Sequence, residues 1–186
     1  MTKILCVSTS LGEASRSRAL LRLVHTGLGA TDGVEARWLD LAENTMPLCD
    51  GRHPLAAYGE PVAKVSLAIE AADALVFGMA VYCYSVSGTL KNLIDLCARA
   101  MDSKPFGVVA AAGGQMSYMS VGDLQRILMF ECRAYPFPRA IYSSGSDWDK
   151  AGARDEGLDE GVVERVEQFV AGFAPFAARF SASSPE

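Results

Sequence analysis

The fold is decided by the stretch Ser8-Thr-Ser-Leu-Gly-Glu-Ala-Ser-Arg-Ser-Arg18, which joins the apolar run 4–8 to a helical pattern over 19–25. This order predicts a strand, a turn and the N-terminus of a helix. The free N–H groups and the dipole of a first helical turn attract anions, and Ser hydroxyls with Arg16 or Arg18 would add donors. The same stretch is equally typical of a Ser-rich helix cap that binds nothing.

The glycine spacing narrows the kind of anion. A dinucleotide fingerprint needs three glycines at fixed spacing, and a nucleoside-triphosphate loop ends in Gly-Lys-Ser or Gly-Lys-Thr. Neither pattern occurs in this stretch. A single terminal phosphate, as on a mononucleotide, is therefore the anion that fits best.

The composition is that of a compact globular chain. It has 186 residues, 50% of them hydrophobic, and a formal charge of −5 at pH 7. We expect one domain over residues 1–180 and a flexible tail over 181–186. The acidic balance argues against nucleic acid or an anionic membrane as a partner.

The cysteines and the apolar runs indicate the compartment. The five cysteines form no Cys-x-x-Cys pair, so neither a disulfide framework nor a zinc site is expected, and no other metal site is signalled. No apolar run is long enough for a membrane span, and none precedes the first strand as a signal peptide would. The expected location is the cytoplasm.

Apolar runs and helical patterns alternate from end to end. The expected strands are 3–9, 34–40, 74–80, 105–112 and 139–142, and the expected helices are 15–28, 60–72, 87–101, 121–132 and 157–180. The first, third and fourth strands are unbroken apolar runs, which is typical of strands buried on both faces. The pattern predicts an α/β doubly wound sheet of five parallel strands, order 2-1-3-4-5, with helices on both faces.

Two features interrupt the alternation of strands and helices, and each predicts a local structure. The connection over 42–58 is long for this class of fold and is expected to form a rim or a lid. Pro175 is expected to kink or end the last helix.

Ligands of such sheets bind beyond the carboxyl ends of the strands, where the strand order reverses. For order 2-1-3-4-5 this position brings together the loops 10–17, 80–87 and 112–118. Tyr82 and Tyr84 in the second loop offer rings or hydroxyls, and Gly113 with Gly114 in the third permits close backbone contact. Each of these loops is also compatible with an ordinary turn.

Three motifs in this order resemble the flavodoxin-like NAD(P)H-dependent FMN reductases, most closely the flavin reductases of sulfonate-utilisation systems. The first is Thr9-Ser10 followed by Ser15-Arg16-Ser17-Arg18-Ala19-Leu20. The second runs from Val81 through Ser87-Gly88-Thr89-Leu90-Lys91-Asn92 to Asp95, and the third is Gly113-Gly114 after a strand.

The resemblance implies FMN and NAD(P)H as cofactors and assigns a role to each loop. It implies that the FMN phosphate is held by Ser10, Ser15, Arg16 and Ser17. It implies that the flavin ring lies against two further segments, which are Ala80, Val81, Tyr82, Cys83 and Ser85, and Ala112, Gly113, Gly114, Gln115 and Met116. Three positions depart from the pattern usual in that family, since Gly12 replaces an Arg, Ala80 a Pro, and Cys83 an Asn or Lys.

The chemistry implied is hydride transfer from the nicotinamide to flavin N5, followed by delivery of electrons to a small-molecule acceptor. The flavin carries this chemistry, so no side chain is expected to act as a catalytic acid or base. Backbone N–H groups from Gly113 to Met116 would stabilise negative charge on the reduced flavin. Cys83 is expected to be a small packing residue rather than a nucleophile.

The helical patterns 121–132 and 87–101 are apolar over more than one face. The excess predicts burial against another subunit, and hence a homodimer or homotetramer. Other functions stay open at this point. A quinone, azo-dye or metal-oxyanion reductase would use the same pocket, and a non-catalytic FMN-binding electron carrier or a flavin-free interaction protein would share the fold.

Overall fold

The computed structural model describes residues 1–53, 55–148 and 157–181. Its strands are β1 (Thr2–Ser8), β2 (Val34–Asp40), β3 (Ala74–Tyr82), β4 (Ser85–Val86), β5 (Pro105–Ala111), β6 (Tyr135–Pro136) and β7 (Ile141–Ser143). Its α-helices are α1 (Arg16–Gly29), α2 (Glu60–Glu70), α3 (Gly88–Cys97), α4 (Ser120–Cys132) and α5 (Glu160–Ser181). Short 3-10 helices are η1 (Leu55–Tyr58), η2 (Ala98–Met101), η3 (Gln115–Ser117) and η4 (Gly145–Asp147). Residues 182–186 of the expected tail lie outside the described residues.

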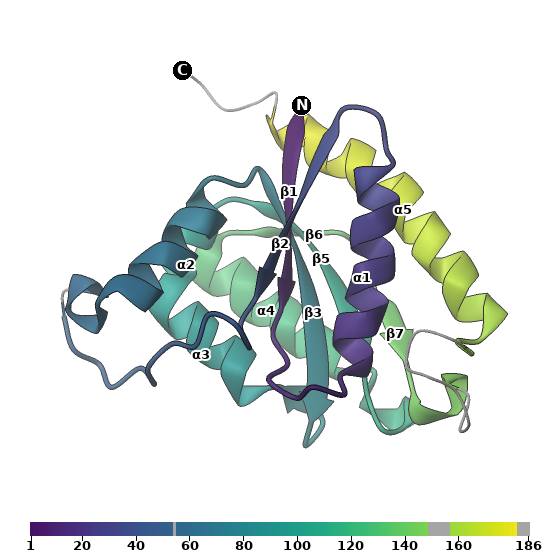
Figure 1. Ribbon diagram of the computed structural model, residues 1–186, viewed down its shortest axis with the longest axis horizontal. Coiled ribbons are helices and arrows are strands. Elements are labelled where there is room, and N and C mark those ends of the chain that lie inside the picture. The colour runs from purple at the N-terminus through teal and green to yellow at the C-terminus, as the bar shows by residue number, and fades with distance from the viewer. Residues whose placement is uncertain (54, 149–156, 182–186) are drawn as a thin grey trace.

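The strands form one sheet in the order β2-β1-β3-β5-β6, and these neighbours run parallel (Figure 1). The predicted fold class and strand order are confirmed. The predicted count of five strands is wrong, because the described residues contain seven. β4 is a short antiparallel addition to β3, and the expected last strand is replaced by β6 and β7, both parallel to β5.

The last strand is split because two prolines interrupt its hydrogen-bond ladder. Pro136 ends β6, and Pro138 stands between β6 and β7. A proline has no N–H to donate to the neighbouring strand. Pairing with β5 therefore stops after Phe137 N–H, which donates to the Phe106 carbonyl at 2.7 Å, and resumes at Ile141.

Helices cover both faces of the sheet, with α1 and α5 on one face and α2, α3 and α4 on the other (Figure 1). Alternate residues of β1 serve the two layers. Ile4 and Cys6 pack on the side of α1 and α5, whereas Leu5 and Val7 pack on the other side. Both sets are buried, which explains the unbroken apolar run in the sequence.

Aromatic rings hold α5 against β5. A Cβ at Gly107 would lie 2.4 Å from the Phe169 ring, so only glycine lets the helix come this close. Pro175 was expected to kink or end the helix, and the second alternative is wrong, since α5 continues to Ser181. The last turn is held by packing, because the Phe180 ring lies 4.6 Å from that of Tyr135 and 5.2 Å from that of Phe176.

The two broad apolar helices behave differently. On α3, residues Leu93, Ile94, Leu96 and Cys97 are all buried within the chain itself. The expectation that this helix needs a second subunit to cover it is therefore wrong. On α4, the expected inner face, which is Val121, Leu124 and Leu128, is buried, but Phe130 is 84% exposed.

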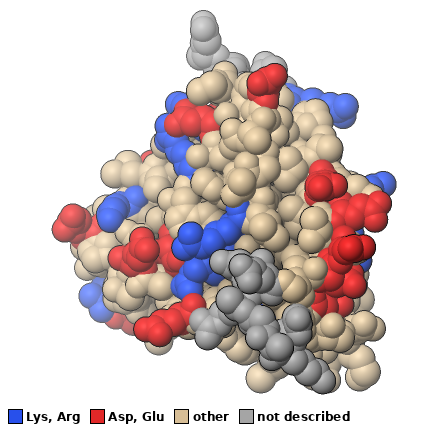
Figure 2. Space-filling model, turned by 45° about the vertical axis from the view of Figure 1, so that its right-hand side comes forward, with Lys and Arg blue, Asp and Glu red and all other residues tan. Residues whose placement is uncertain are grey.

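No helix in the described ranges is long and apolar enough to cross a membrane. The surface in Figure 2 carries basic side chains in small groups among acidic ones, and acidic groups gather along its right-hand edge. This face presents no continuous basic surface of the kind that nucleic acid requires.

Candidate functional site

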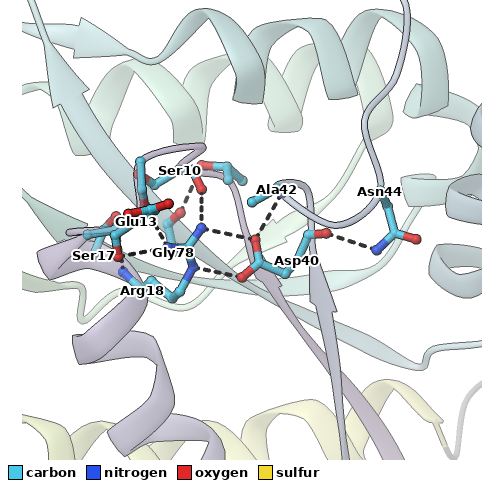
Figure 3. Close-up of polar contacts among 11 residues, drawn as sticks. Ser10, Glu13, Ser17, Arg18, Asp40, Ala42, Asn44 and Gly78 are labelled. Carbon is cyan, nitrogen blue, oxygen red and sulfur yellow. Dashed lines mark hydrogen bonds and ion pairs between the residues drawn. The ribbon is translucent and has the colours of Figure 1, made fainter.

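The first loop leaves β1 after Ser8 and enters α1 at Arg16 (Figure 3). Ser15 is the N-cap, and its hydroxyl accepts a hydrogen bond from the backbone N–H of Arg18 at 3.1 Å. The hydroxyls of Ser15 and Ser17 lie 3.1 Å apart and share a hydrogen bond. Two hydroxyls carry two protons, and their mutual bond uses one, so the pair keeps one donor for a ligand.

The backbone of this loop is suited to an anion. Within the described part of the chain, the N–H groups from Ser10 to Ser15 donate no hydrogen bond. Successive N–H groups of this kind form an anion-binding concavity, and the dipole of α1 adds positive potential. Arg16 is exposed, lies with its guanidinium 5.9 Å from the centre of the Trp148 ring, and forms no ion pair with any residue in the described ranges. Its charge is therefore available to an anion.

The sequence offers Arg18 with Arg16 as a possible anion donor, although the family resemblance assigns the phosphate to Arg16 alone of the two. The Arg18 guanidinium turns back toward the loop and binds the carboxylate of Asp40 at 2.7 Å (Figure 3). The structure thus distinguishes the two arginines: the Arg16 side chain is exposed, whereas the Arg18 side chain is paired with Asp40.

Gly78 on β3 lets α1 approach the sheet at this loop. A Cβ there would lie 2.8 Å from Leu21 Cδ2 and 3.3 Å from the Ser17 carbonyl oxygen. The carbonyl of Gly78 also accepts hydrogen bonds from Thr9, at 3.2 Å from the backbone N–H and 2.8 Å from the hydroxyl. The first loop is therefore anchored directly on β3.

The second loop is a two-residue hairpin between β3 and β4. Cys83 and Tyr84 form its turn with φ of 50° and 63°, and the strands pair through Val81 with Val86 and Tyr82 with Ser85. Both central residues have positive φ, as in the type I′ turns that fit the twist of a hairpin. Cys83 is exposed, so the expectation that it is a small packing residue is wrong. Tyr82 and Tyr84 are more than half exposed, at 62% and 63%.

The third loop follows β5 and is held by β7 and η4. The N–H of Ala112 donates to the Ser143 carbonyl at 2.9 Å, and the Gly113 carbonyl accepts from Gly145 N–H at 3.2 Å. The Tyr142 hydroxyl donates to the Gly114 carbonyl. Burial raises the pKa of Tyr142 above its ordinary value, which keeps this hydroxyl protonated as a donor.

The rest of the third loop is open. A Cβ at Gly113 or Gly114 would meet nothing within 4 Å, and Gln115 and Met116 are exposed. A planar ligand can therefore come close to the backbone here.

The three loops emerge side by side, as expected. Ser8 pairs with Gly78 across β1 and β3, and Ala80 pairs with Ala111 across β3 and β5. Each loop thus starts at the carboxyl end of a strand that neighbours the next. Among the described residues, a loop with unpaired N–H groups, an aromatic hairpin and a glycine-bearing loop start side by side at the switch point of the sheet.

Comparison with known proteins identifies this combination. A family model described as NADPH-dependent FMN reductase matches residues 2–149. The chain belongs to the NADPH-dependent FMN reductase family. The family expected from the three sequence motifs is confirmed, and with it the class of oxidoreductase and the pairing of FMN with a nicotinamide nucleotide.

The relatives of this FMN reductase family member include curated enzymes and solved structures. An NAD(P)H-dependent FAD/FMN reductase of Geobacillus thermodenitrificans is 31% identical over 136 residues, covering 73% of this chain and 71% of that protein. The NADH-dependent FMN reductase SfnF of Pseudomonas putida is 28% identical over 153 residues, covering 80% of each. The structure of the NAD(P)H:(acceptor) oxidoreductase FerB of Paracoccus denitrificans matches with a TM-score of 0.77 at 20% identity, covering 97% of this chain and 99% of that one.

The donor set of the site fits FMN. The cradle of N–H groups, the Ser15–Ser17 hydroxyl pair and Arg16 suit a terminal phosphate. The hairpin rings and the open backbone at Gly113 and Gly114 suit a planar ring system. In the described ranges, no three or more His, Cys, Asp or Glu side chains come together as a metal site.

Asn92 in the second family motif has a structural task. Its side-chain oxygen accepts from Cys49 N–H at 2.8 Å, and its amide donates to the Pro47 carbonyl at 3.0 Å. The long connection expected as a rim or lid is thereby fastened to α3. It is also closed on itself, since the buried Tyr58 hydroxyl donates to the Asp50 carboxylate at 2.8 Å.

Sequence reasoning missed the segment of η4. A cavity of about 470 Å³ lies between it and the third loop, lined by Gln115, Tyr118, Ala140, Tyr142, Ser144, Asp147 and Arg165. The Ser144 hydroxyl accepts from the backbone N–H of Asp147, and the Asp147 carboxylate accepts from the backbone N–H of Ser144 at 2.7 Å, which makes a capping box for η4. The signal that could have found it is the Ser144-Gly-Ser-Asp147 cluster directly after a strand.

Proposed function

We propose that this chain is an NAD(P)H-dependent FMN reductase that takes hydride from the nicotinamide and passes electrons to a small-molecule acceptor. The observation that carries the proposal is the meeting of the phosphate cradle, the β3–β4 hairpin and the Gly113–Gly114 loop at one edge of the sheet. FMN supplies the hydride-accepting centre when bound. The chain then has to bind, orient and electrostatically support it.

Each loop has a separate task in this proposal. Ser10, Ser15, Arg16 and Ser17 hold the phosphate. Ala80, Val81, Tyr82, Cys83 and Ser85 line one part of the ring. Ala112, Gly113, Gly114, Gln115 and Met116 line the other, where backbone N–H groups would stabilise negative charge on the pyrimidine side.

The direct test is the visible absorption of the purified chain, followed by oxidation of NADPH and of NADH with and without added FMN. We expect saturable flavin binding and FMN-dependent turnover. Turnover with quinones, azo dyes or oxyanions as acceptors then ranks the alternatives that share this pocket. Absence of both flavin binding and turnover would refute the reductase and the electron-carrier hypotheses together.

A paired ligand test assigns the phosphate loop. Ser15→Ala combined with Arg16→Ala should weaken FMN at least tenfold more than riboflavin, because only FMN carries the phosphate. The matched control is Arg22→Ala, because Arg22 lies in the second turn of α1 and its guanidinium lies 5.2 Å from the centre of the Trp38 ring on β2. Equal losses for the two ligands would place the phosphate elsewhere.

The proposal includes a homodimer formed through α4. Met119, the N-cap of α4, and Phe130 are 76% and 84% exposed and lie about three helical turns apart, so they lie on the same side of the helix axis. Exposed apolar stripes of this kind favour burial against a second subunit. Phe130→Asp should give a monomer in sedimentation velocity, and a monomeric wild-type chain would refute the dimer.

Residues 1–180 form one domain in this proposal, and the protein works in the cytoplasm. Support for the domain comes from the single sheet, which both helical layers share. Support for the location comes from the cysteines, all of which carry free thiols. Fractionation of the source cells checks the location.

A further inference from the structure

The guanidinium of Arg18 makes an unusually complete set of contacts behind the phosphate loop (Figure 3). Its two terminal nitrogens donate to the carbonyls of Gly12 and Ser10, each at 2.6 Å, and more weakly to that of Glu13 at 3.4 Å. Its Nε donates to Asp40 Oδ2 at 2.7 Å, and one terminal nitrogen also reaches Oδ1 at 3.3 Å. The side chains of Arg18 and Asp40 are only 12% and 4% exposed.

These contacts determine which way the loop's N–H groups point. In a trans peptide the C=O of one residue and the N–H of the next point in opposite directions. The carbonyls of Ser10, Gly12 and Glu13 converge on Arg18, so the N–H groups of Leu11, Glu13 and Ala14 point away from it. The same N–H groups have no acceptor within the described ranges.

Asp40 is held in place from its own side. It ends β2, pairs with Ser8 of β1, and its carboxylate also accepts from Ala42 N–H at 3.0 Å. Its carbonyl accepts from the Asn44 amide at 2.9 Å. The pair therefore links the loop between β1 and α1 to the end of the neighbouring strand β2.

Electrostatics alone does not explain this arrangement. A buried carboxylate close to an anion site repels the anion, and it neutralises an arginine that could have bound the anion directly. A rigid fork that holds three carbonyls does explain it, because preorganising a loop reduces the entropy lost when the ligand binds.

We infer that Arg18 and Asp40 are positioning residues that preform the phosphate cradle and thereby set the preference for FMN over riboflavin. This inference rests on the proposed function, because it needs FMN to bind in this loop. It assigns no contact with the ligand to either side chain.

The test compares dissociation constants for FMN and riboflavin in Asp40→Asn, Arg18→Met and Arg18→Lys, with thermal unfolding measured in parallel. For Asp40→Asn, the explanation by charge alone and the explanation by loop positioning predict opposite changes in FMN affinity. Removing a negative charge and releasing Arg18 should tighten FMN if only charge matters. If the pair braces the loop, FMN should weaken about tenfold while riboflavin changes less than about twofold.

Arg18→Lys distinguishes positioning of the loop from direct contact with the phosphate, because lysine keeps the positive charge but lacks the several donors of the guanidinium. If Arg18 positions the loop, Arg18→Lys should lose nearly as much FMN affinity as Arg18→Met does. The matched controls are Arg133→Met and Asp102→Asn, which break a second Arg–Asp pair that is exposed and away from the loop. Both controls should leave the ratio of the two dissociation constants unchanged.

The outcomes separate the inference from the proposed function. A wild-type chain that binds no FMN refutes the proposed function, and the inference with it. A wild-type chain that binds FMN, with Asp40→Asn equal or tighter or with Arg18→Lys equal to wild type, refutes the inference alone. Should Arg18→Met fail to fold, Asp40→Asn and Arg18→Lys still decide, because each is read from a ratio of two ligands.

Discussion

The hydroxyl of Ser85 donates a hydrogen bond of 2.8 Å to the carboxylate of Asp123, which lies in the first turn of α4. This contact joins the hairpin between β3 and β4 to the helix that follows the third loop. Two segments of the proposed flavin site are thus tied together by side chains that lie 38 positions apart in the sequence. This hydrogen bond holds the β3–β4 hairpin at a fixed distance from the N-terminus of α4, which follows the third loop.

Removal of the tie should loosen the hairpin. In Asp123→Ala we expect the KM for FMN to rise about fivefold, since a hydrogen bond to a charged group contributes about 1 kcal/mol or more. Asp123→Asn keeps an acceptor oxygen and should recover most of the loss. Steady-state kinetics with NADPH at saturation measures both, and unchanged KM in Asp123→Ala would mean that the hairpin is held by its backbone alone.

The hairpin turn carries local strain. Cys83 and Tyr84 both have positive φ, which costs a residue with a side chain roughly 1 kcal/mol and costs Gly or Asn less. Cys83→Asn and Tyr84→Gly should therefore each raise the free energy of unfolding, by about 0.5–1 kcal/mol.

The opposite substitution provides the control for the turn. Cys83→Val places a β-branched side chain at φ 50° and should lower the free energy of unfolding. Urea unfolding followed by circular dichroism compares the three variants. If Asn and Val have the same effect at position 83, the turn conformation does not limit stability.

Gly145 should be sensitive to a single added carbon. A Cβ there would lie 2.8 Å from the Gly113 carbonyl oxygen, a backbone atom that cannot rotate away, and 3.3 Å from Arg16 Nη1. We expect Gly145→Ala to lower the free energy of unfolding by about 1–3 kcal/mol and to weaken FMN binding, because the third loop must shift.

Gly122 on α4 is the matched control for that substitution. A Cβ at Gly122 would meet nothing within 4 Å, and alanine suits a helix better than glycine by up to about 1 kcal/mol. Gly122→Ala should therefore be neutral or stabilising. Equal effects at the two glycines would contradict the close approach of η4 to the third loop.

Stability should fall at alkaline pH because of buried thiols. Burial raises the pKa of Cys6 and of Cys97 from 9.0 to about 12. The folded state thus keeps protons that the unfolded state releases, so the contribution is complete below pH 9 and is lost as pH rises from about 9 to 12. The expected slope is about 1.4 kcal/mol per pH unit for each thiol.

Cys6→Ala isolates one of these contributions. It should lower the free energy of unfolding at pH 7 and flatten the loss above pH 9, since one titrating group is gone. Val76→Ala truncates another buried side chain of the same core cluster without removing a titrating group, and its loss should be the same at every pH. Urea unfolding at several pH values measures how the free energy of unfolding changes with pH for each variant. If the Cys6→Ala and wild-type curves are parallel above pH 9, Cys6 does not cause the alkaline loss of stability.

The parts of the fold that could be predicted are those in which the pattern is local. Unbroken apolar runs marked β1, β3 and β5, because strands buried on both faces have no polar side to alternate with. The split of the last strand was missed, since it depends on where Pro136 and Pro138 meet the ladder of β5. The last helix was predicted to reach residue 180, and of the two outcomes expected at Pro175 its end is wrong, since α5 continues to Ser181 with the Phe176 and Phe180 rings 5.2 Å apart.

For the site, residue type and position along the chain were sufficient to name the three loops and the family. The stretch from Ser8 to Arg18 by itself predicted a strand, a turn and a helix N-terminus, because serine caps and apolar periodicity act over a few residues. The sequence resemblance assigned the phosphate to Arg16, but the ion pair between Arg18 and Asp40 was shown only by the tertiary structure. Arg16 and Arg18 point to different sides of α1, and the side that meets Asp40 is known only when β2 lies next to β1. The contact between Gly145 and Gly113 likewise needs β7 beside β5, since chain segments this far apart meet only through the sheet.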